Sequence, residues 1–259
     1  EETFPIWYSG EVILVIPSLE TILYPDIENT KLLKKYSHLY TIKKNLKNAK
    51  KIVCFTESTQ RELNEKLNIS EEKIVTIAPF FPSSKEIKLT LDIKAKLGIQ
   101  WDYFIYDYNY YSNNNLKRVL EAIKEIAKKR EIYLVILGNK NANNREIREL
   151  ILSLDMSKHI VFAGTPEGNE LGSYYKESLG VIYPIIYDNF PMTLHHALNY
   201  NTPILASDNT ETRNIFGESI TYFSPISVSS MVKNITAFLD AGKKLPNYEN
   251  VKNKYNISD

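Results

Sequence analysis

The residues whose types and spacing could best support chemistry lie in the segment 187–207, YDNFPMTLHHALNYNTPILAS. Asp188 follows a buried-strand pattern, and Pro191 stands where the first turn of a helix tolerates proline. The unpaired amides of such a first turn favour an anion, and a nearby carboxylate accepts hydrogen bonds from hydroxyl groups. The segment is therefore a candidate cradle for a phosphate and a hydroxylated group. The alternative is a plain strand-to-helix corner.

Two histidines, His195 and His196, occupy adjacent positions of the helix predicted in this segment. Adjacent residues of an α-helix point about 100° apart, so the pair does not predict a metal site, and the sequence offers no partner ligand. The pair is either a partly exposed feature of the helix or a part of the site.

Short apolar runs alternate with amphipathic stretches, and these elements must position the candidate loop. The expected strands are residues 11–16, 51–55, 73–78, 103–106, 133–138, 160–164, 180–184 and 203–207. The expected helices include residues 59–68, 115–130 and 145–154. Several strands lack polar alternation, which is typical of parallel strands covered by helices on both faces. The pattern predicts a doubly wound α/β architecture, in which ligands bind at the carboxyl ends of the strands.

Composition excludes several classes of protein. The 32 basic and 31 acidic residues leave a net charge of +1, which gives no electrostatic reason to bind nucleic acid. The one cysteine, Cys54, lies in the apolar run KIVCF and is expected in the core. No apolar run approaches the roughly 20 residues that a membrane-spanning helix needs, and no signal peptide is evident.

A domain boundary is predicted near residues 79–86, PFFPSSKE, because prolines and serines interrupt the periodicity there. This divides the chain into an amino-terminal piece, residues 1–82, and a larger domain, residues 83–259. The first piece is too small for a whole doubly wound sheet, which suggests that upstream sequence is absent.

Two more loops follow predicted strands at the same edge of the sheet. The loop DYNYYSNNN, residues 107–115, leads into a helix that Asn114 or Asn115 can cap, and the helix start would favour an anion. The loop that begins at Gly138 is another helix entry and carries no catalytic signature.

The order of these segments resembles the retaining glycosyltransferases of group 1, which form family 4 of the carbohydrate-enzyme classification and have the GT-B fold. Residues 181–207 follow the family's donor-site segment throughout, and DNTETRNIFGESITYFSP, residues 208–225, is similar to the segment that comes next. ILVIPSLETILYP (13–25), KNLKNAKKIVCFTESTQRELNEKL (44–67) and YFIYDYNYYSNNNLKRVLEAI (103–123) resemble other family elements. The resemblance implies an α/β fold of two Rossmann-like domains, the amino-terminal one incomplete, in a chain truncated at both ends.

The resemblance also implies roles for individual residues. Asp188 would be the catalytic acidic residue near the donor sugar. The donor-binding residues would be Asn189, Phe190, Pro191, Met192, His196, Asn113, Asn114 and Gly138. Thr56, Glu57 and Ser58 would face the interdomain cleft from the other side. No metal site and no cofactor are implied.

Two departures from the family pattern bear on catalysis. The family has two glutamates eight residues apart; here they are Asp188, a shorter carboxylate, and His196, which would hydrogen-bond the ribose. The family's basic pair at the donor diphosphate is replaced by Ser112-Asn113-Asn114. Lys117 or Arg118 would compensate only if its side chain faces the loop.

The implied activity is transfer of a sugar from a UDP- or GDP-sugar to a hydroxyl group of a glycan or lipid-linked acceptor, with retention of configuration. The implied location is cytoplasmic, at the inner face of a membrane, with peripheral contact through segments outside this sequence. One alternative is a weakened or inactive homologue that serves as a binding or scaffold subunit. Another is a different GT-B enzyme, such as a sugar-nucleotide epimerase.

Overall fold

The structure is a computed structural model that describes residues 4–5, 7–8, 10–16, 19–23, 32–77, 91–108, 115–138, 144–166, 170–187 and 192–254. Contacts divide the chain into two compact units, Glu1–Phe80 with Tyr187–Pro191, and Phe81–Ile186 with Met192–Asp259. The boundary predicted at residues 82 and 83 lies outside the described residues.

The second unit contains a parallel six-stranded sheet in the order β6-β5-β4-β7-β8-β9. Its strands are β4 (Tyr103–Asp107), β5 (Tyr133–Leu137), β6 (Ile160–Gly164), β7 (Gly180–Tyr183), β8 (Ile204–Ser207) and β9 (Thr221–Phe223). The first five were predicted. β9 was not, because it is a three-residue edge strand in which only Phe223 is fully buried, so no apolar run marks it.

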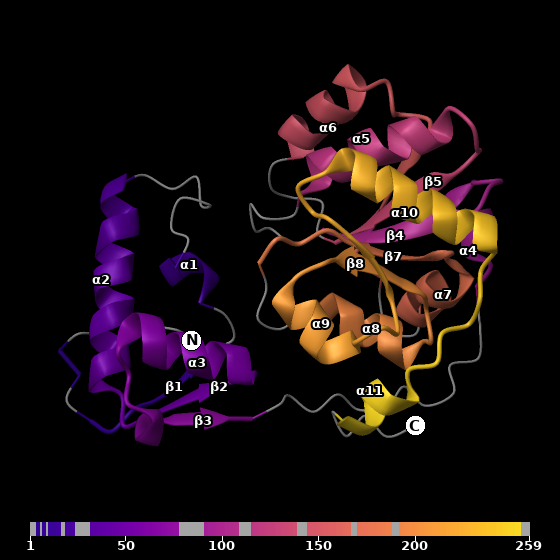
Figure 1. Ribbon diagram of the computed structural model, residues 1–259. Helices are drawn as coiled ribbons and strands as arrows, with labels where there is room; N and C mark the ends of the chain where they lie inside the picture. Colours follow the sequence, from indigo (N-terminus) through magenta and orange to yellow (C-terminus); the bar gives the residue numbers. More distant parts are fainter. Residues whose placement is uncertain are drawn as a thin grey trace. The chain divides into compact units, whose positions relative to one another are not determined.

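Helices cover both faces of this sheet, as the absence of polar alternation predicted (Figure 1). One face carries α5 (Leu116–Ala127), α6 (Asn144–Ser153) and α10 (Val228–Ala241). The other carries α4 (Ile93–Leu97), α7 (Glu170–Glu177), α8 (Met192–Asn199), α9 (Thr210–Phe216) and α11 (Glu249–Lys254). Successive residues of β4 feed the two cores alternately: Tyr103 and Ile105 join one, and Phe104 and Tyr106 join the other.

The first unit contains a parallel three-stranded sheet in the order β1-β2-β3. Its elements are β1 (Ile13–Ile16), α1 (Glu20–Leu23), α2 (Leu32–Asn48), β2 (Lys51–Cys54), α3 (Glu57–Leu67), the short 3₁₀ helix η2 (Glu71–Lys73) and β3 (Ile74–Thr76).

One face of that sheet packs into a helix-covered core, which includes Cys54 as predicted. On the other face Val15, Val53 and Val75 lie side by side in register, and Val15 and Val75 are 40% and 38% exposed. A doubly wound sheet has helices on both faces. In the described part of this unit, helices cover one face of the sheet.

None of the helices that the structure describes combines the length and apolar character needed to span a bilayer.

Candidate functional site

The chain changes direction across the six-stranded sheet between β4 and β7. From β4 it continues to β5 and β6 on one side, then returns to β7, β8 and β9 on the other. In open α/β sheets such a switch point opens a crevice at the carboxyl ends of the strands, and ligands bind there. We call the edge formed by the ends of β4 and β7 the switch-point crevice. Its described residues are Asp107, Asn115, Arg118, Pro184, Thr193 and His196.

Asn115 ties the exits of two strands to the start of α5. Its side-chain Nδ2 donates to the carbonyl oxygens of Pro184 (3.1 Å), just after β7, and Pro225 (2.6 Å), just after β9. Asn115 occupies the N-cap position with φ of 50°, a left-handed conformation that asparagine tolerates, and makes no side-chain capping bond. Asn115 thus stands at the predicted cap position without a capping bond, since its Oδ1 accepts from Arg118 instead; Asn114, the other predicted cap, lies outside the described residues.

Arg118 reaches back toward the first turn of α5. Its Nη1 donates to Asn115 Oδ1 at 2.8 Å, and its side chain is half-buried. Lys117, the adjacent basic residue, is exposed. Of the two, Arg118 is thus directed toward the crevice, where a guanidinium can bind two anionic oxygens at once.

A second network ties the end of β7 to the start of α9. Asn209 Nδ2 donates to the carbonyl oxygen of Ile185 at 3.3 Å, while Asn209 Oδ1 caps α9 by accepting from Thr212 N at 2.9 Å. The hydroxyl of Thr212 donates to Ser207 O at 2.6 Å. These bonds fix the β7 and β8 exits at the carboxyl edge of the sheet.

Asp107, the last residue of β4, is a half-buried carboxylate that faces α8. Its Oδ2 accepts a hydrogen bond from Thr193 Oγ1 at 3.0 Å. Burial raises the pKa of Asp107, while the Thr193 hydrogen bond and the charge of His196 lower it. The sequence pattern singled out neither Asp107 nor Thr193. The only available signal was an acidic residue directly after an apolar strand.

The two histidines of α8 have different surroundings. His195 is 3% exposed, and burial, assisted by the charge of His196, lowers its pKa to about 4. His196 is half-buried; burial lowers its pKa and the charge of Asp107 raises it. A partly exposed pair is therefore the wrong description of His195, which lies inside the core. His196 is partly exposed and electrostatically coupled to Asp107, and its predicted role in donor binding stays a prediction.

Gly138, at the end of β5, has a backbone role. Its φ is 118°, and an added Cβ would lie 2.3 Å from the carbonyl oxygen of Tyr108. Its amide donates to Gly164 O at 2.9 Å, and Tyr108 N donates to Leu137 O at 2.8 Å. Because it has no side chain, Gly138 allows the backbone that follows β5 to lie against the backbone that follows β4. Its predicted role in donor binding stays a prediction.

Several residues predicted for the site lie outside the described residues: Asp188, Asn189, Phe190, Pro191, Asn113 and Asn114. Met192 is described as the first residue of α8.

The residues predicted for an interdomain cleft belong to the first unit. Thr56 caps α3, because its hydroxyl accepts from Thr59 N at 3.2 Å. Glu57 is exposed and Ser58 is half-buried in the first turn of that helix. Their role at a cleft stays a prediction.

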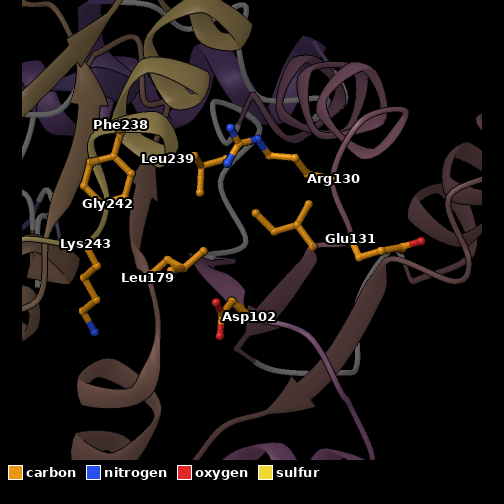
Figure 2. A pocket seen from close by; sticks show the side chains of 9 residues that line it. Asp102, Arg130, Glu131, Leu179, Phe238, Leu239, Gly242 and Lys243 are labelled. Carbon is orange, nitrogen blue, oxygen red and sulfur yellow. The ribbon is translucent and has the colours of Figure 1, made fainter.

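A pocket of about 450 Å³ lies at the opposite, amino-terminal ends of the same strands. Figure 2 shows Lys243 and Arg130 on opposite sides of it, with Leu179 and Leu239 between them. Lys243 Nζ donates to the carbonyl oxygens of Lys176 (3.0 Å) and Ser178 (2.5 Å), which end α7. Arg130 pairs with Asp240. These cations already have protein partners.

Residues 90–254 match the profile of the family described as glycosyl transferases group 1. The match covers more than half of the chain. The chain is a member of the group 1 glycosyltransferases. This match includes β4 to β9, and with them every described residue of the switch-point crevice.

Similar proteins agree with the family assignment. The O-antigen chain mannosyltransferase RfbU of Salmonella typhimurium is 21% identical over 241 residues, which are 91% of this chain and 64% of that protein. The chain, a group 1 family member, thus spans less than two thirds of this relative's length.

Solved structures share the fold at low identity. Sucrose-phosphate synthase from Thermosynechococcus elongatus aligns with a TM-score of 0.68 and 17% identity over 96% of this chain and 67% of that chain. Anabaena HepE in complex with UDP-glucose aligns with a TM-score of 0.75 and 10% identity over 95% of this chain and 67% of that chain. The parallel α/β sheets are therefore of the GT-B type, as the sequence resemblance implied.

Proposed function

We propose that the protein transfers a sugar from a UDP- or GDP-sugar to a hydroxyl group of a glycan or lipid-linked acceptor, with retention of configuration. The observation that carries this proposal is the half-buried guanidinium of Arg118 at the first turn of α5, beside the switch-point crevice of a group 1 family member. The second unit would bind the donor, and the first would contribute to the acceptor side.

The chemistry requires stabilisation of a leaving nucleoside diphosphate. Arg118 supplies one positive charge, and the first-turn amides of α5 and α8 add partial positive charge. Preorganised donors of this kind stabilise developing negative charge without reorganisation. Arg118 would thus replace the basic pair that the Ser112-Asn113-Asn114 sequence lacks, and no metal ion would be needed.

The predicted donor residues have distinct tasks in this proposal. Asp188 would accept hydrogen bonds from hydroxyl groups of the donor sugar, while Asn189, Phe190, Pro191 and Met192 would line the phosphates and the sugar. Asn113, Asn114 and Gly138 would lie along the diphosphate, and His196 toward the ribose. Thr56, Glu57 and Ser58 would meet the donor from the first unit as the enzyme closes.

The names of similar proteins support the substrate classes. HepE was solved with UDP-glucose, and RfbU is named for mannosyl transfer to O-antigen chains. A hexose donor and an envelope glycan built on a lipid carrier follow as the first candidates for this chain. The site of action would then be cytoplasmic, at the inner face of the membrane.

The direct test is calorimetric titration of the protein with UDP-glucose and GDP-mannose, followed by turnover assays with lipid-linked glycans. We expect binding of at least one donor, and transfer or slow donor hydrolysis. Binding without turnover under every condition would favour a binding or scaffold subunit. Absence of any nucleotide binding would refute the proposal.

Asp188→Ala separates catalysis from folding. We expect turnover to fall at least about 100-fold, because hydrogen bonds made in the transition state are lost, with unchanged urea unfolding. Asp240→Ala is the matched control, since Asp240 is an exposed carboxylate that pairs with Arg130. Wild-type turnover in Asp188→Ala would remove Asp188 from the site.

A further inference from the structure

Three polar side chains from three elements lie together in the second unit. They are Asp107 at the end of β4, His196 in α8 and Tyr175 in α7. The rings of Tyr175 and His196 have centroids 5.8 Å apart. Electrostatic coupling links Asp107 to both partners, since its charge raises the pKa of His196 and of Tyr175. The cluster therefore brings three groups with hydrogen-bonding capacity into one small region.

Asp107 has fewer partners than a half-buried carboxylate needs. Burial of a carboxylate is costly unless it is paired and hydrogen-bonded. Across the described chain, Asp107 takes part in one hydrogen bond, from Thr193 Oγ1 to its Oδ2. Its Oδ1 accepts nothing from the described residues. A residue that only fastened α8 to β4 would not require a charged group, because an amide would accept the Thr193 bond equally well.

Tyr175 shows the same shortfall more sharply. Its side chain is fully buried, and its hydroxyl lacks a hydrogen-bond partner among the described residues. Buried polar groups without partners are rare in folded proteins and call for an explanation. Two groups with unused hydrogen-bonding capacity, the half-buried Asp107 and the fully buried Tyr175, thus lie in the same cluster as His196.

The chemistry of the cluster selects its ligand. A carboxylate is an acceptor only, and a neutral imidazole has one acceptor nitrogen. Asp107 and His196 can therefore both accept hydrogen bonds from hydroxyl groups. Since ligands of such sheets bind at the carboxyl ends of the strands, the hydroxylated part of a nucleotide-sugar is a suitable ligand. Ribose and the transferred sugar each carry adjacent hydroxyl groups of this kind.

We propose that Asp107 is a further donor-binding residue, whose Oδ1 accepts a hydrogen bond from a hydroxyl group of the nucleotide-sugar. The inference rests on the proposed function of the same crevice and adds a residue to it. Asp107 thereby supplies from β4 a carboxylate that α8 does not carry at position 196.

The test compares Asp107→Asn with Asp102→Asn by calorimetry. Asp102 directly precedes β4, so the two variants remove one negative charge at opposite ends of the same strand. Titrants are the nucleoside diphosphate of the bound donor, its 2′,3′-dideoxy analogue and the nucleotide-sugar itself. We expect Asp107→Asn to weaken binding about 10- to 100-fold, as loss of a charged hydrogen-bond acceptor does, and Asp102→Asn to change it less than about 3-fold.

The titrants separate the two sources of the hydroxyl group. If ribose is the ligand, Asp107→Asn weakens binding of the diphosphate and no longer matters for the dideoxy analogue. If the sugar is the ligand, the loss appears only with the nucleotide-sugar. Both results support the proposal.

A structural role gives a different pattern. Thr193→Val removes the one hydrogen bond to Oδ2, so an effect of Asp107 through α8 would appear in both variants. Equal weakening in Thr193→Val and Asp107→Asn overturns the proposal, as does unchanged binding in a folded Asp107→Asn. If Asp107→Asn does not fold, Asp107→Ser with the same three titrants decides, because it also removes the carboxylate, and unchanged binding in that variant overturns the proposal. Wild-type protein that binds none of the titrants refutes the proposed function and the inference together.

Discussion

The two ends of the six-stranded sheet carry charged side chains in opposite situations. At the amino ends Lys243 binds two carbonyl oxygens, Arg130 pairs with Asp240, and Lys94 donates to Asp102 at 2.6 Å, around a pocket of about 450 Å³. At the carboxyl ends Asp107 makes one hydrogen bond to a described residue, and Arg118 makes its bond to a neutral amide. The cations beside this pocket are thus already paired with protein groups.

This difference follows from the direction of the strands. Parallel strands direct the amino ends of the following helices toward the carboxyl edge, so partial positive charge collects there. Charges whose partners are neutral or few are the ones able to bind a ligand. Substitutions at the two ends of the sheet should therefore differ in their effect on ligand binding.

The largest expected effect tests the backbone of the carboxyl edge. In Gly138→Ala the new Cβ would meet Tyr108 O at 2.3 Å, at a φ of 118°. Strain and overlap together should lower the free energy of unfolding by about 3 kcal/mol or more, and donor binding should weaken as the β4 exit shifts. Gly98→Ala is the matched control: its φ is 65° and nothing lies within 4 Å of the added Cβ, so about 1 kcal/mol is expected. Equal losses in urea unfolding would contradict the close approach.

A smaller effect is expected when one basic residue at each end of the sheet is replaced and nucleotide affinity is measured. Arg118→Gln should weaken nucleoside diphosphate binding about 10- to 100-fold, because a charged hydrogen bond contributes about 1.5–3 kcal/mol. Lys243→Met should leave that affinity unchanged and cost only about 1 kcal/mol of stability through its lost carbonyl bonds. Lys117→Gln is the control for charge next to Arg118. Calorimetry that ranks Lys243→Met or Lys117→Gln above Arg118→Gln would reverse the comparison.

The smallest effect concerns pH. The pKa of His195 is lowered to about 4, mainly by burial, whereas in the unfolded chain it is about 6.5. The unfolded state therefore binds more protons as pH falls through 6.5, and stability is lost until pH reaches about 4. Between pH 7 and 5.5 the loss from this residue should be about 1 kcal/mol. In His195→Gln the free energy of unfolding, measured in urea, should fall by that much less between pH 7 and 5.5. An unchanged dependence of this free energy on pH would place His195 outside the core.

The elements that an apolar run defines were predictable from sequence, and those defined by distant partners were not. β4 and α5 follow directly from YFIY and the amphipathic stretch after it. Asp107 has its significance only through Thr193, 86 positions away, and Asn115 through carbonyls 69 and 110 positions away. A local pattern therefore predicted Asn115 at the start of the helix, but not its bonds to the strand exits. The role of Asp188 rests on the family resemblance and stays a prediction.

We expect a nucleotide-sugar to bind at the carboxyl ends of β4 and β7. A crystal structure of the protein with UDP-glucose or GDP-mannose is the decisive measurement. The diphosphate should lie at the first turn of α5, within hydrogen-bonding distance of Arg118, with a hydroxyl group at Asp107. A nucleotide in the pocket between Asp102 and Lys243, with the switch-point crevice unchanged, would contradict it.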